Sequence, residues 1–326
     1  MKVLVTGANG FVGSALCAEL RRRSIDWRGA MRRPPAGADP HVVMMPSLAP
    51  DADWSAALEG IDVVIHAAAR VHVMRDQAAD PLAEFRRANT EGTLTFARQA
   101  AAAGVKRFVF VSSIKVNGER TLPGQPFVPQ VAQAPCDPYG LSKYEAEEGL
   151  KSLAAETGLE FAIVRPPLVY GPGVGANFLS MMRWIARGVP LPLGAINNRR
   201  SLVALDNLVD LLLTCATHPS AANRVFLVSD GEDLSTTDLL RRLGRAMGKP
   251  PRLLPVPAVA LRWGTALLGR GDIGRRLCGS LQVDASETSR TLGWKPVICV
   301  DAALVKVAAA FADSDRQNRN PVTDIR

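Results

Sequence analysis

The stretch that decides the fold is Lys2–Gly13, which reads KVLVTGANGFVG. A short apolar strand pattern runs directly into Gly7, Gly10 and Gly13, and a helical pattern over 11–23 begins among these glycines. Glycine allows a tight turn and a close approach to a pyrophosphate, whose charge the free N–H groups of a helix N-terminus bind. The stretch predicts a dinucleotide-binding turn, and an ordinary strand-to-helix turn is the alternative.

Strand and helix patterns alternate along the rest of the first half. Apolar, β-branched runs predict strands at 2–6, 27–31, 41–45, 62–67, 107–112, 161–165 and 224–228. Helical patterns separate them, notably at 11–23, 80–103 and 140–157. Continuous apolar strands joined by crossover helices predict an α/β fold with a doubly wound parallel sheet, whose ligands bind at the carboxyl ends of the strands.

The second half of the chain differs in composition from the first and contains clustered prolines and glycines. We predict a dinucleotide-binding domain over 1–165, to which 201–230 returns. A smaller, more helical substrate-binding lobe is expected from 166–200 and 231–312. The polar end, 313–326, shows no apolar periodicity, which predicts a disordered tail.

The composition is that of a globular protein, with 47% hydrophobic residues among 326. The apolar stretch 253–269 contains two prolines and Arg262, which predicts a buried or pocket-lining helix and no membrane span. The net charge of +8 comes with short arginine groups, without aromatic interleaving or a nucleic-acid motif. Small anionic ligands and a solvated surface explain these groups, so no nucleic-acid partner is expected.

Cysteine and histidine patterns indicate neither a disulfide framework nor a metal site. The five cysteines are scattered without CxxC spacing, and no signal peptide is visible, which predicts reduced thiols and a cytoplasmic location. The four histidines lack metal-ligand spacing, and His66 lies inside the strand pattern 62–67, where a packed core residue is expected. We therefore expect no metal.

The second strand pattern ends on Arg32 and Arg33, with no carboxylate. An Asp or Glu there bonds the ribose hydroxyls of NAD, whereas an arginine matches the 2′-phosphate of NADP. The two arginines favour NADP(H), with NAD(H) as the alternative, unless they only face solvent.

The stretch YGLSK carries a tyrosine and a lysine four residues apart, Tyr139 and Lys143. On a helix these positions share one face, so phenol and ammonium point into the same cleft. A nearby cation lowers the high pKa of a phenol, which can then exchange a proton with a carbinol while hydride moves to or from a nicotinamide.

Taken together and in this order, the motifs resemble the extended short-chain dehydrogenase/reductase family, and within it the NAD(P)-dependent nucleotide-sugar epimerases, dehydratases and reductases. The resemblance covers about residues 1–312 and implies a Rossmann sheet and a homodimer formed through the helices near 80–103 and 140–157. It rests on TGANGFVG (6–13), DVVIHAAA (62–69), NTEGT (89–93), SSIKVNG (112–118), YGLSK (139–143), RPPLVYGPG (165–173), RSLVALDNLVD (200–210) and LGWKP (292–296).

The resemblance implies a role for each catalytic residue. Ser113 would bond the substrate oxygen, Tyr139 would be the acid/base, and Lys143 would bond the nicotinamide ribose and lower the tyrosine pKa. Around the cofactor, besides Tyr139 and Lys143, it places Gly7, Asn9, Gly10, Phe11, Val12, Gly13, Arg32, Arg33, Ser47, Leu48, Ala67, Ala68, Ala69, Asn89, Val111, Ser112, Pro166 and Leu168.

The same resemblance implies contacts with a nucleotide-diphosphate sugar, expected to be UDP-linked. Asn177 and Arg200 fall where the family binds the diphosphate, for which a guanidinium has the right charge. Arg276 is a second phosphate candidate. Asp284 either contacts the nucleotide or caps the following helix.

The stretch SSIKVNG departs from the family at three positions. Ile114 and Lys115 stand where the 4,6-dehydratases carry an acid pair, which argues against a dehydratase. Lys115 either contacts the substrate or faces solvent. Asn117 replaces the usual tyrosine and leaves a polar group near the substrate.

The basic end of the second strand and the SSIKVNGE signature favour a reductase that uses NADP(H) to reduce a 4-keto nucleotide sugar. Its substrate would be of the UDP-4-keto-6-deoxy-N-acetylhexosamine type, and its pathway the biosynthesis of surface polysaccharide. A UDP-sugar 4-epimerase with tightly bound NAD is the alternative. A non-catalytic NADP-binding protein is a third reading, against which the retained Ser113, Tyr139 and Lys143 argue.

Overall fold

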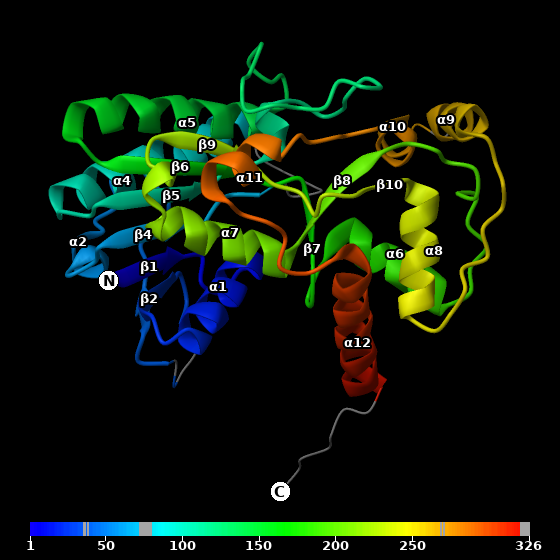
Figure 1. The fold of residues 1–326 in the computed structure, drawn as a ribbon, viewed down its shortest axis with the longest axis horizontal. Coiled ribbons are helices and arrows are strands. Elements are labelled where there is room, and N and C mark those ends of the chain that lie inside the picture. The colour runs from blue at the N-terminus through cyan, green and yellow to red at the C-terminus, as the bar shows by residue number, and fades with distance from the viewer. Residues whose placement is uncertain (35–36, 38, 72–79, 268, 270, 320–326) are drawn as a thin grey trace, which may run out of the picture.

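A parallel sheet of seven strands forms the centre of the larger part of the molecule (Figure 1). The computed structural model describes residues 1–326 except 35–36, 38, 72–79, 268, 270 and 320–326. The strand order is β3-β2-β1-β4-β5-β6-β9, which confirms the doubly wound topology. The strands are β1 (Lys2–Thr6), β2 (Asp26–Met31), β3 (Val42–Met44), β4 (Val63–His66), β5 (Arg107–Val111), β6 (Glu160–Arg165) and β9 (Arg224–Leu227).

Helices cover both faces of this sheet because successive strand residues point to opposite sides. On one face, Val3 and Val5 pack with α1 (Phe11–Arg22) and α7 (Leu205–Thr217). On the other face, Leu4 packs with α4 (Gly92–Ala102), α5 (Pro138–Thr157) and the short α2 (Ser55–Leu58). Both faces are therefore buried, as uninterrupted apolar strands require.

The predicted helix over 80–103 consists of three segments. They are α3 (Pro81–Phe85), the π-helical η1 (Arg86–Glu91) and α4. In η1 the hydrogen bonds reach back five residues, as from the N–H of Gly92 to the carbonyl of Arg87. Two short 3-10 turns, η2 (Ile114–Val116) and η3 (Pro219–Ala221), lie elsewhere in this part of the chain.

A second, smaller unit contains a three-stranded sheet that the sequence patterns do not predict. Its order is β10-β8-β7, with β8 parallel to β7 and antiparallel to β10. The strands are β7 (Leu168–Tyr170), β8 (Arg200–Ala204) and β10 (Asp233–Leu234). Its helices are α6 (Ala176–Ala186), α8 (Thr236–Ala246), α9 (Ala258–Leu267), α10 (Gly271–Cys278) and α12 (Val300–Arg319), whereas α11 (Ser286–Leu292) packs against β9 of the large sheet. Of the segment 201–230, α7 and β9 lie with the large sheet, whereas β8 belongs to the small one.

The end of the chain differs from its prediction. Residues 313–319 continue α12 and are not a disordered tail. Leu304 and Val307 anchor this helix in the core of the smaller unit, and an anchored helix extends into polar sequence because each added residue gains a backbone bond. The remainder of the predicted tail, 320–326, lies outside the described residues.

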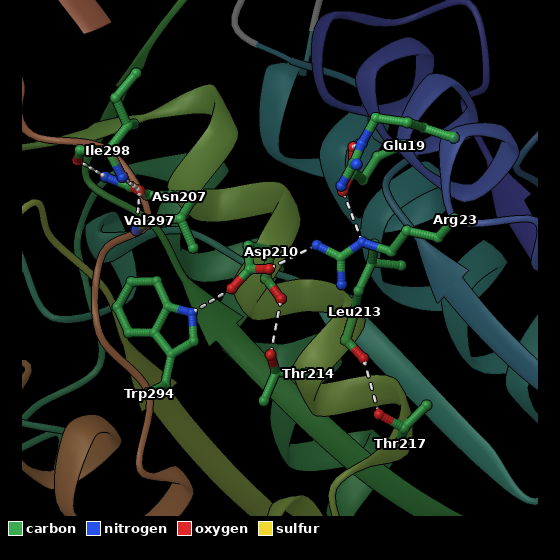
Figure 2. Close-up of polar contacts among 11 residues, drawn as sticks. Glu19, Arg23, Asn207, Asp210, Leu213, Thr214, Thr217, Trp294, Val297 and Ile298 are labelled. Atoms are coloured by element: carbon green, nitrogen blue, oxygen red, sulfur yellow. Dashed lines mark hydrogen bonds and ion pairs between the residues drawn. The ribbon is translucent and has the colours of Figure 1, made fainter. Parts of the chain in front are cut away.

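Helix α7 ties the two units together through the buried Asn207 and the half-buried Asp210 (Figure 2). Asn207 donates to the carbonyl of Ile298 at 2.9 Å and accepts from the N–H groups of Val297 and Ile298 at 2.8 and 3.0 Å. Asp210 accepts from Trp294 Nε1 at 2.9 Å and from Arg23 of α1 at 2.6 Å. The segment between α11 and α12 is thus fixed to the large sheet's own helix.

Candidate functional site

The turn between β1 and α1 is shaped to receive an anion. Gly7 has a φ of +68°, and a Cβ on Gly13 would lie 2.0 Å from the carbonyl oxygen of Gly7, so both positions require glycine. Gly10 caps α1 without a side-chain hydrogen bond, and the fully described first turn contains no acidic residue. The free N–H groups of this turn fit a dinucleotide pyrophosphate. Of the other residues predicted here, Asn9 is exposed and Phe11 and Val12 are half-buried.

The ends of β1, β4, β5 and β6 meet at one edge, since these strands are parallel. Ala68 donates its N–H to Thr6 Oγ1 at 3.2 Å, Ser112 donates to the carbonyl of Val164 at 2.8 Å, and Ile114 donates to that of Pro166 at 3.0 Å. This edge brings together the predicted cofactor residues of four strand ends, namely Gly7, Ala67, Ala68, Ala69, Val111, Ser112 and Pro166. Leu168, the first residue of β7, is exposed.

His66 at the end of β4 is a core residue, as predicted. It is fully buried, with Nδ1 2.7 Å from Thr6 Oγ1 and Nε2 3.1 Å from Thr93 Oγ1. Burial and the neighbouring Lys143 hold its pKa well below the usual value, so the ring stays neutral. Among the described residues, no group of three or more His, Cys, Asp or Glu is placed to hold a metal ion.

The predicted contacts to the adenosine half lie at the ends of β2 and β3. Arg32 and Arg33 follow β2 directly and are both exposed, so they are accessible to a ligand. Ser47 is exposed and Leu48 half-buried after β3. The backbone of Leu48 passes so close to Gly92 that a Cβ there would lie 2.8 Å from its carbonyl carbon.

Helix α5 carries Tyr139 and Lys143 on one face, beginning at a well-formed cap. Asp137 accepts from the N–H of Gly140 at 2.8 Å, and Pro138 occupies the first helical position. Lys143 is 1% exposed, donates from Nζ to the carbonyl of Val111 at 3.0 Å and lies 4.3 Å from the centre of the Phe110 ring. The helix thus fixes the ammonium against the end of β5.

The pKa values of these two groups depart from the direction that the family resemblance implies. Burial, with a further contribution from Asp137, raises the pKa of Tyr139 to about 12. Burial also lowers the pKa of Lys143 to about 7, although Glu147 acts in the opposite direction. Without ligand, burial therefore favours the neutral amine of Lys143, and the phenol stays protonated at neutral pH. A positive charge must reach this site before Tyr139 can act as a base.

Lys115 lies beside Tyr139 and forms ion pairs with Asp137 and Glu119. Its Nζ is 3.1 Å from Asp137 Oδ1, 3.8 Å from Glu119 Oε1 and 5.9 Å from the centre of the Tyr139 ring. Ser113 begins the turn η2, and its Oγ accepts from the N–H of Lys115 at 3.2 Å. Because Ser113 is half-buried and accepts this bond, its own O–H remains to donate to a substrate oxygen.

A buried ion pair behind the catalytic face is absent from the sequence predictions. Glu147 and Arg165 are 0% and 1% exposed and form a two-point salt bridge, with Nε to Oε1 at 2.9 Å. Ser112 also donates to Glu147. Asn117 accepts from Arg165 at 3.0 Å and donates to the carbonyl of Val128 at 2.7 Å, so its amide is already occupied by the protein. The signal for Glu147 is its spacing, four residues after Lys143 on the buried face.

Asn89 of η1 joins the segment at Arg70 to helix α5 through hydrogen bonds. It is 1% exposed, accepts from the N–H of Arg70 at 2.8 Å and donates to Ser142 Oγ at 3.1 Å. Thr90 donates to the carbonyl of Ser142 at 2.8 Å. The π-helical segment therefore holds α5 at the residue that precedes Lys143.

The predicted substrate contacts of the smaller unit lie on separate elements. Arg200 begins β8, and its Nη1 donates to the carbonyls of Arg276 at 2.9 Å and Gly279 at 3.2 Å; burial lowers its pKa. Arg276 is exposed on α10, and Asn177 is exposed in the first turn of α6. Asp284 precedes Ala285, the N-cap of α11, and accepts from the N–H of Ser286 at 2.9 Å, although no side chain caps this helix.

A glycine turn at a helix N-terminus, a doubly wound sheet and a Tyr–Lys pair at its edge define a class of dinucleotide-binding enzyme, and the chain belongs to the NAD dependent epimerase/dehydratase family, which matches residues 3–229. It is therefore an NAD(P)-dependent enzyme of the extended short-chain dehydrogenase/reductase type. The UDP-glucose 4-epimerase of Vibrio cholerae is 47% identical over 318 residues, which cover 97% of each chain.

Solved structures share the fold over nearly the whole chain. A short-chain dehydrogenase/reductase superfamily protein from Agrobacterium tumefaciens with bound NAD has a TM-score of 0.76 at 23% identity, covering 98% of this chain and 100% of that one. MoeE5 in complex with UDP-glucose and NAD has a TM-score of 0.76 at 23% identity, covering 96% and 99%.

Proposed function

We propose that this enzyme is a 4-epimerase of a UDP-linked sugar and that it keeps NAD bound between turnovers. The placement of Ser113, Tyr139 and Lys143 at the sheet edge beside the glycine turn carries the proposal. The 47% identity to a UDP-glucose 4-epimerase, over 97% of both chains, supports this reading above the reductase that the sequence motifs favour.

Each residue has a defined task in such a reaction. Tyr139 takes the proton from the C4 hydroxyl and later returns one to the C4 oxygen, while Ser113 donates a hydrogen bond to that oxygen. A nicotinamide held by the glycine turn and Lys143 would supply a hydride acceptor for C4 and then a hydride donor to its other face. Lys143 supplies positive charge that favours the phenolate when its amine gains a proton, which a hydrogen-bonding hydroxyl or a nearby anion promotes.

The substrate must stay bound while its keto-sugar rotates between the oxidation and the reduction of C4. Arg200 and Asn177 are the residues that we propose to hold the diphosphate, since Arg200 is fixed by two backbone carbonyls and cannot swing away. Anchoring by the nucleotide leaves the sugar free to present either face to the cofactor.

A 4-keto reductase that uses NADPH is the second candidate, and one observation favours it. Arg32 and Arg33 are exposed at the end of β2, where an NAD enzyme usually carries a carboxylate. A reductase exchanges its cofactor at every turnover, which suits NADPH.

The purified protein distinguishes the two candidates. The epimerase requires NAD released on denaturation, interconversion of UDP-glucose and UDP-galactose or their N-acetyl forms without added cofactor, and loss of that activity in Tyr139→Phe at unchanged circular dichroism. Stoichiometric consumption of NADPH with a 4-keto sugar nucleotide, and no interconversion, would instead establish the reductase. In that case Arg32→Ala with Arg33→Ala should raise the KM for NADPH far more than that for NADH.

A further inference from the structure

Helix α9 exposes an apolar stripe that the sequence patterns place in the interior. In α9, which is described from end to end, no residue is buried, so the helix is not the buried one that was expected, and the pocket-lining alternative stays a prediction. Val259, Trp263 and Leu267 are 64%, 69% and 84% exposed. Their spacing of four residues puts all three on one face of the helix.

The stripe faces outward because the opposite side of α9 is already packed. Ala258 and Leu261 contact the core of the smaller unit. Helix α10 also packs against α9, so closely that a Cβ on Gly274 would lie 2.1 Å from Thr265 Oγ1. Figure 1 shows the two helices side by side at the outer end of the molecule, away from the large sheet.

The surroundings of this stripe are strongly basic. Residues 171–205 and 239–271 contain eleven Lys and Arg residues and no Asp or Glu; of these, Arg241 and Arg242 are paired with Asp238, Glu232 and Asp301 from outside the two spans. The two spans also meet in space, because Leu191 bonds the backbone of Arg252 at 2.8 Å. Arg262, which precedes Trp263 in α9, is exposed, and so is Arg252 on the segment that leads into this helix.

We propose that this face, formed by Val259, Trp263, Leu267, Arg252 and Arg262, docks on the surface of an anionic lipid bilayer. Tryptophan prefers the boundary between headgroups and acyl chains, aliphatic side chains insert just below it, and arginines bind lipid phosphates. No helix among the described residues is long and apolar enough to cross a membrane, so the contact is a peripheral one.

Two other occupants fit the same face less well. A second copy of this chain would bring two surfaces of the same positive charge together, because a twofold contact joins the same patch of both copies. A nucleic acid would match the charge but would leave the apolar stripe in water. The lipid surface satisfies both features at once, and it does so whichever sugar the active site takes.

Cosedimentation of the full chain with vesicles tests the proposal. We expect binding to vesicles of phosphatidylcholine mixed with phosphatidylglycerol and weaker binding to vesicles of phosphatidylcholine alone. Binding should also fall as the salt concentration is raised. Trp263→Ser with Leu267→Ser should lower the partition coefficient by about tenfold or more. Val305→Ser, at a residue 56% exposed on α12, is the control and should leave binding unchanged.

Tryptophan fluorescence supplies a second readout, which does not depend on how much protein sediments. The emission should shift to the blue with anionic vesicles, and Trp263→Phe should abolish the shift while binding persists. Failure to bind anionic vesicles, or unchanged binding in the double serine variant, would overturn the proposal. So would a change of oligomeric state in that variant by analytical ultracentrifugation, because a second copy would then be the occupant. Epimerase activity is measured separately, and neither outcome of the vesicle experiments bears on the proposed epimerase function.

Discussion

At the scale of single residues, Lys115 and Asp137 form a charge pair that bears directly on the catalytic tyrosine. Asp137 raises the pKa of Tyr139 because a negative charge nearby disfavours phenolate. Lys115 is 3.1 Å from Asp137 and 5.9 Å from the Tyr139 ring, so its charge opposes that effect. We therefore expect Lys115 to offset part of the rise in the Tyr139 pKa that burial and Asp137 cause.

Two variants should therefore move the acidic limb of the pH profile of kcat/KM in opposite directions. Lys115→Met leaves Asp137 unopposed and should raise the apparent pKa, whereas Asp137→Asn keeps the helix cap, removes the negative charge and should lower it. Coulomb's law over about 6 Å gives shifts of roughly 0.5 to 2 pH units. The measurement is the sugar interconversion rate from pH 5 to pH 10.

Lys115→Arg is the matched control, because it keeps the charge and should leave the profile close to that of the parent. If both variants moved the limb in the same direction, or if Arg behaved like Met, the pair would not set the tyrosine pKa.

At the scale of elements, α5 and the turn η2 approach each other through a glycine. A Cβ on Gly140 would lie 2.8 Å from the backbone carbonyl oxygen of Lys115, and backbone cannot move aside cheaply. This contact brings the start of α5, with Tyr139, against the turn that Ser113 begins. Helix propensity alone would favour alanine at this position.

Gly140→Ala should accordingly lose about 1–3 kcal/mol of the free energy of unfolding and should lower kcat, because it separates Tyr139 from the turn. Gly264→Ala in α9 is the matched control: a Cβ there has no atom within 4 Å. That variant should gain up to about 1 kcal/mol at unchanged kcat. Urea unfolding and steady-state kinetics measure both, and a Gly140→Ala protein as stable as the parent would contradict the close contact.

The elements also show what the sequence can predict. Strands such as 107–111 were predictable to within one residue because a strand buried on both faces is a continuous apolar run. The break at Arg86–Glu91 was not, since a π-helical segment has the same composition as the helix around it. The Tyr139 and Lys143 positions follow from helical spacing, whereas the Glu147–Arg165 pair joins residues whose contact only the folded chain creates.

The sequence patterns do not predict that the apolar face of α9 is exposed, and the reason is related. Apolar content indicates that a helix can be buried, but it does not say whether a partner covers it. In the same way, the polarity of 313–319 does not exclude helix once Leu304 anchors the preceding turns.

At the scale of the whole molecule, Asn207 couples the two units. It is fully buried and bonds Asp230, Val297 and Ile298 at once. Asn207→Ala leaves these groups unsatisfied and should lower the free energy of unfolding by roughly 2–4 kcal/mol. We expect faster hydrogen exchange at 294–300 and a raised KM for the sugar nucleotide, since that substrate is proposed to bind in the smaller unit.

Thr214→Val is the control for this prediction, because Thr214 bonds only the carbonyl of Asp210 within the same helix, at 2.9 Å. Equal exchange rates at 294–300 in the parent and in Asn207→Ala would show that the two units are held together elsewhere.

The π-helical segment Arg86–Glu91 has a consequence for how this sequence can change over time. It contains one residue more per turn than the helices on either side, as an ancestral insertion would leave behind. Removing any single residue would restore an ordinary helix and rotate everything before it by about 100° relative to α4. Asn89 and Thr90 could then no longer both reach Ser142. This stretch should therefore accept substitutions at its exposed positions far more readily than a change in length.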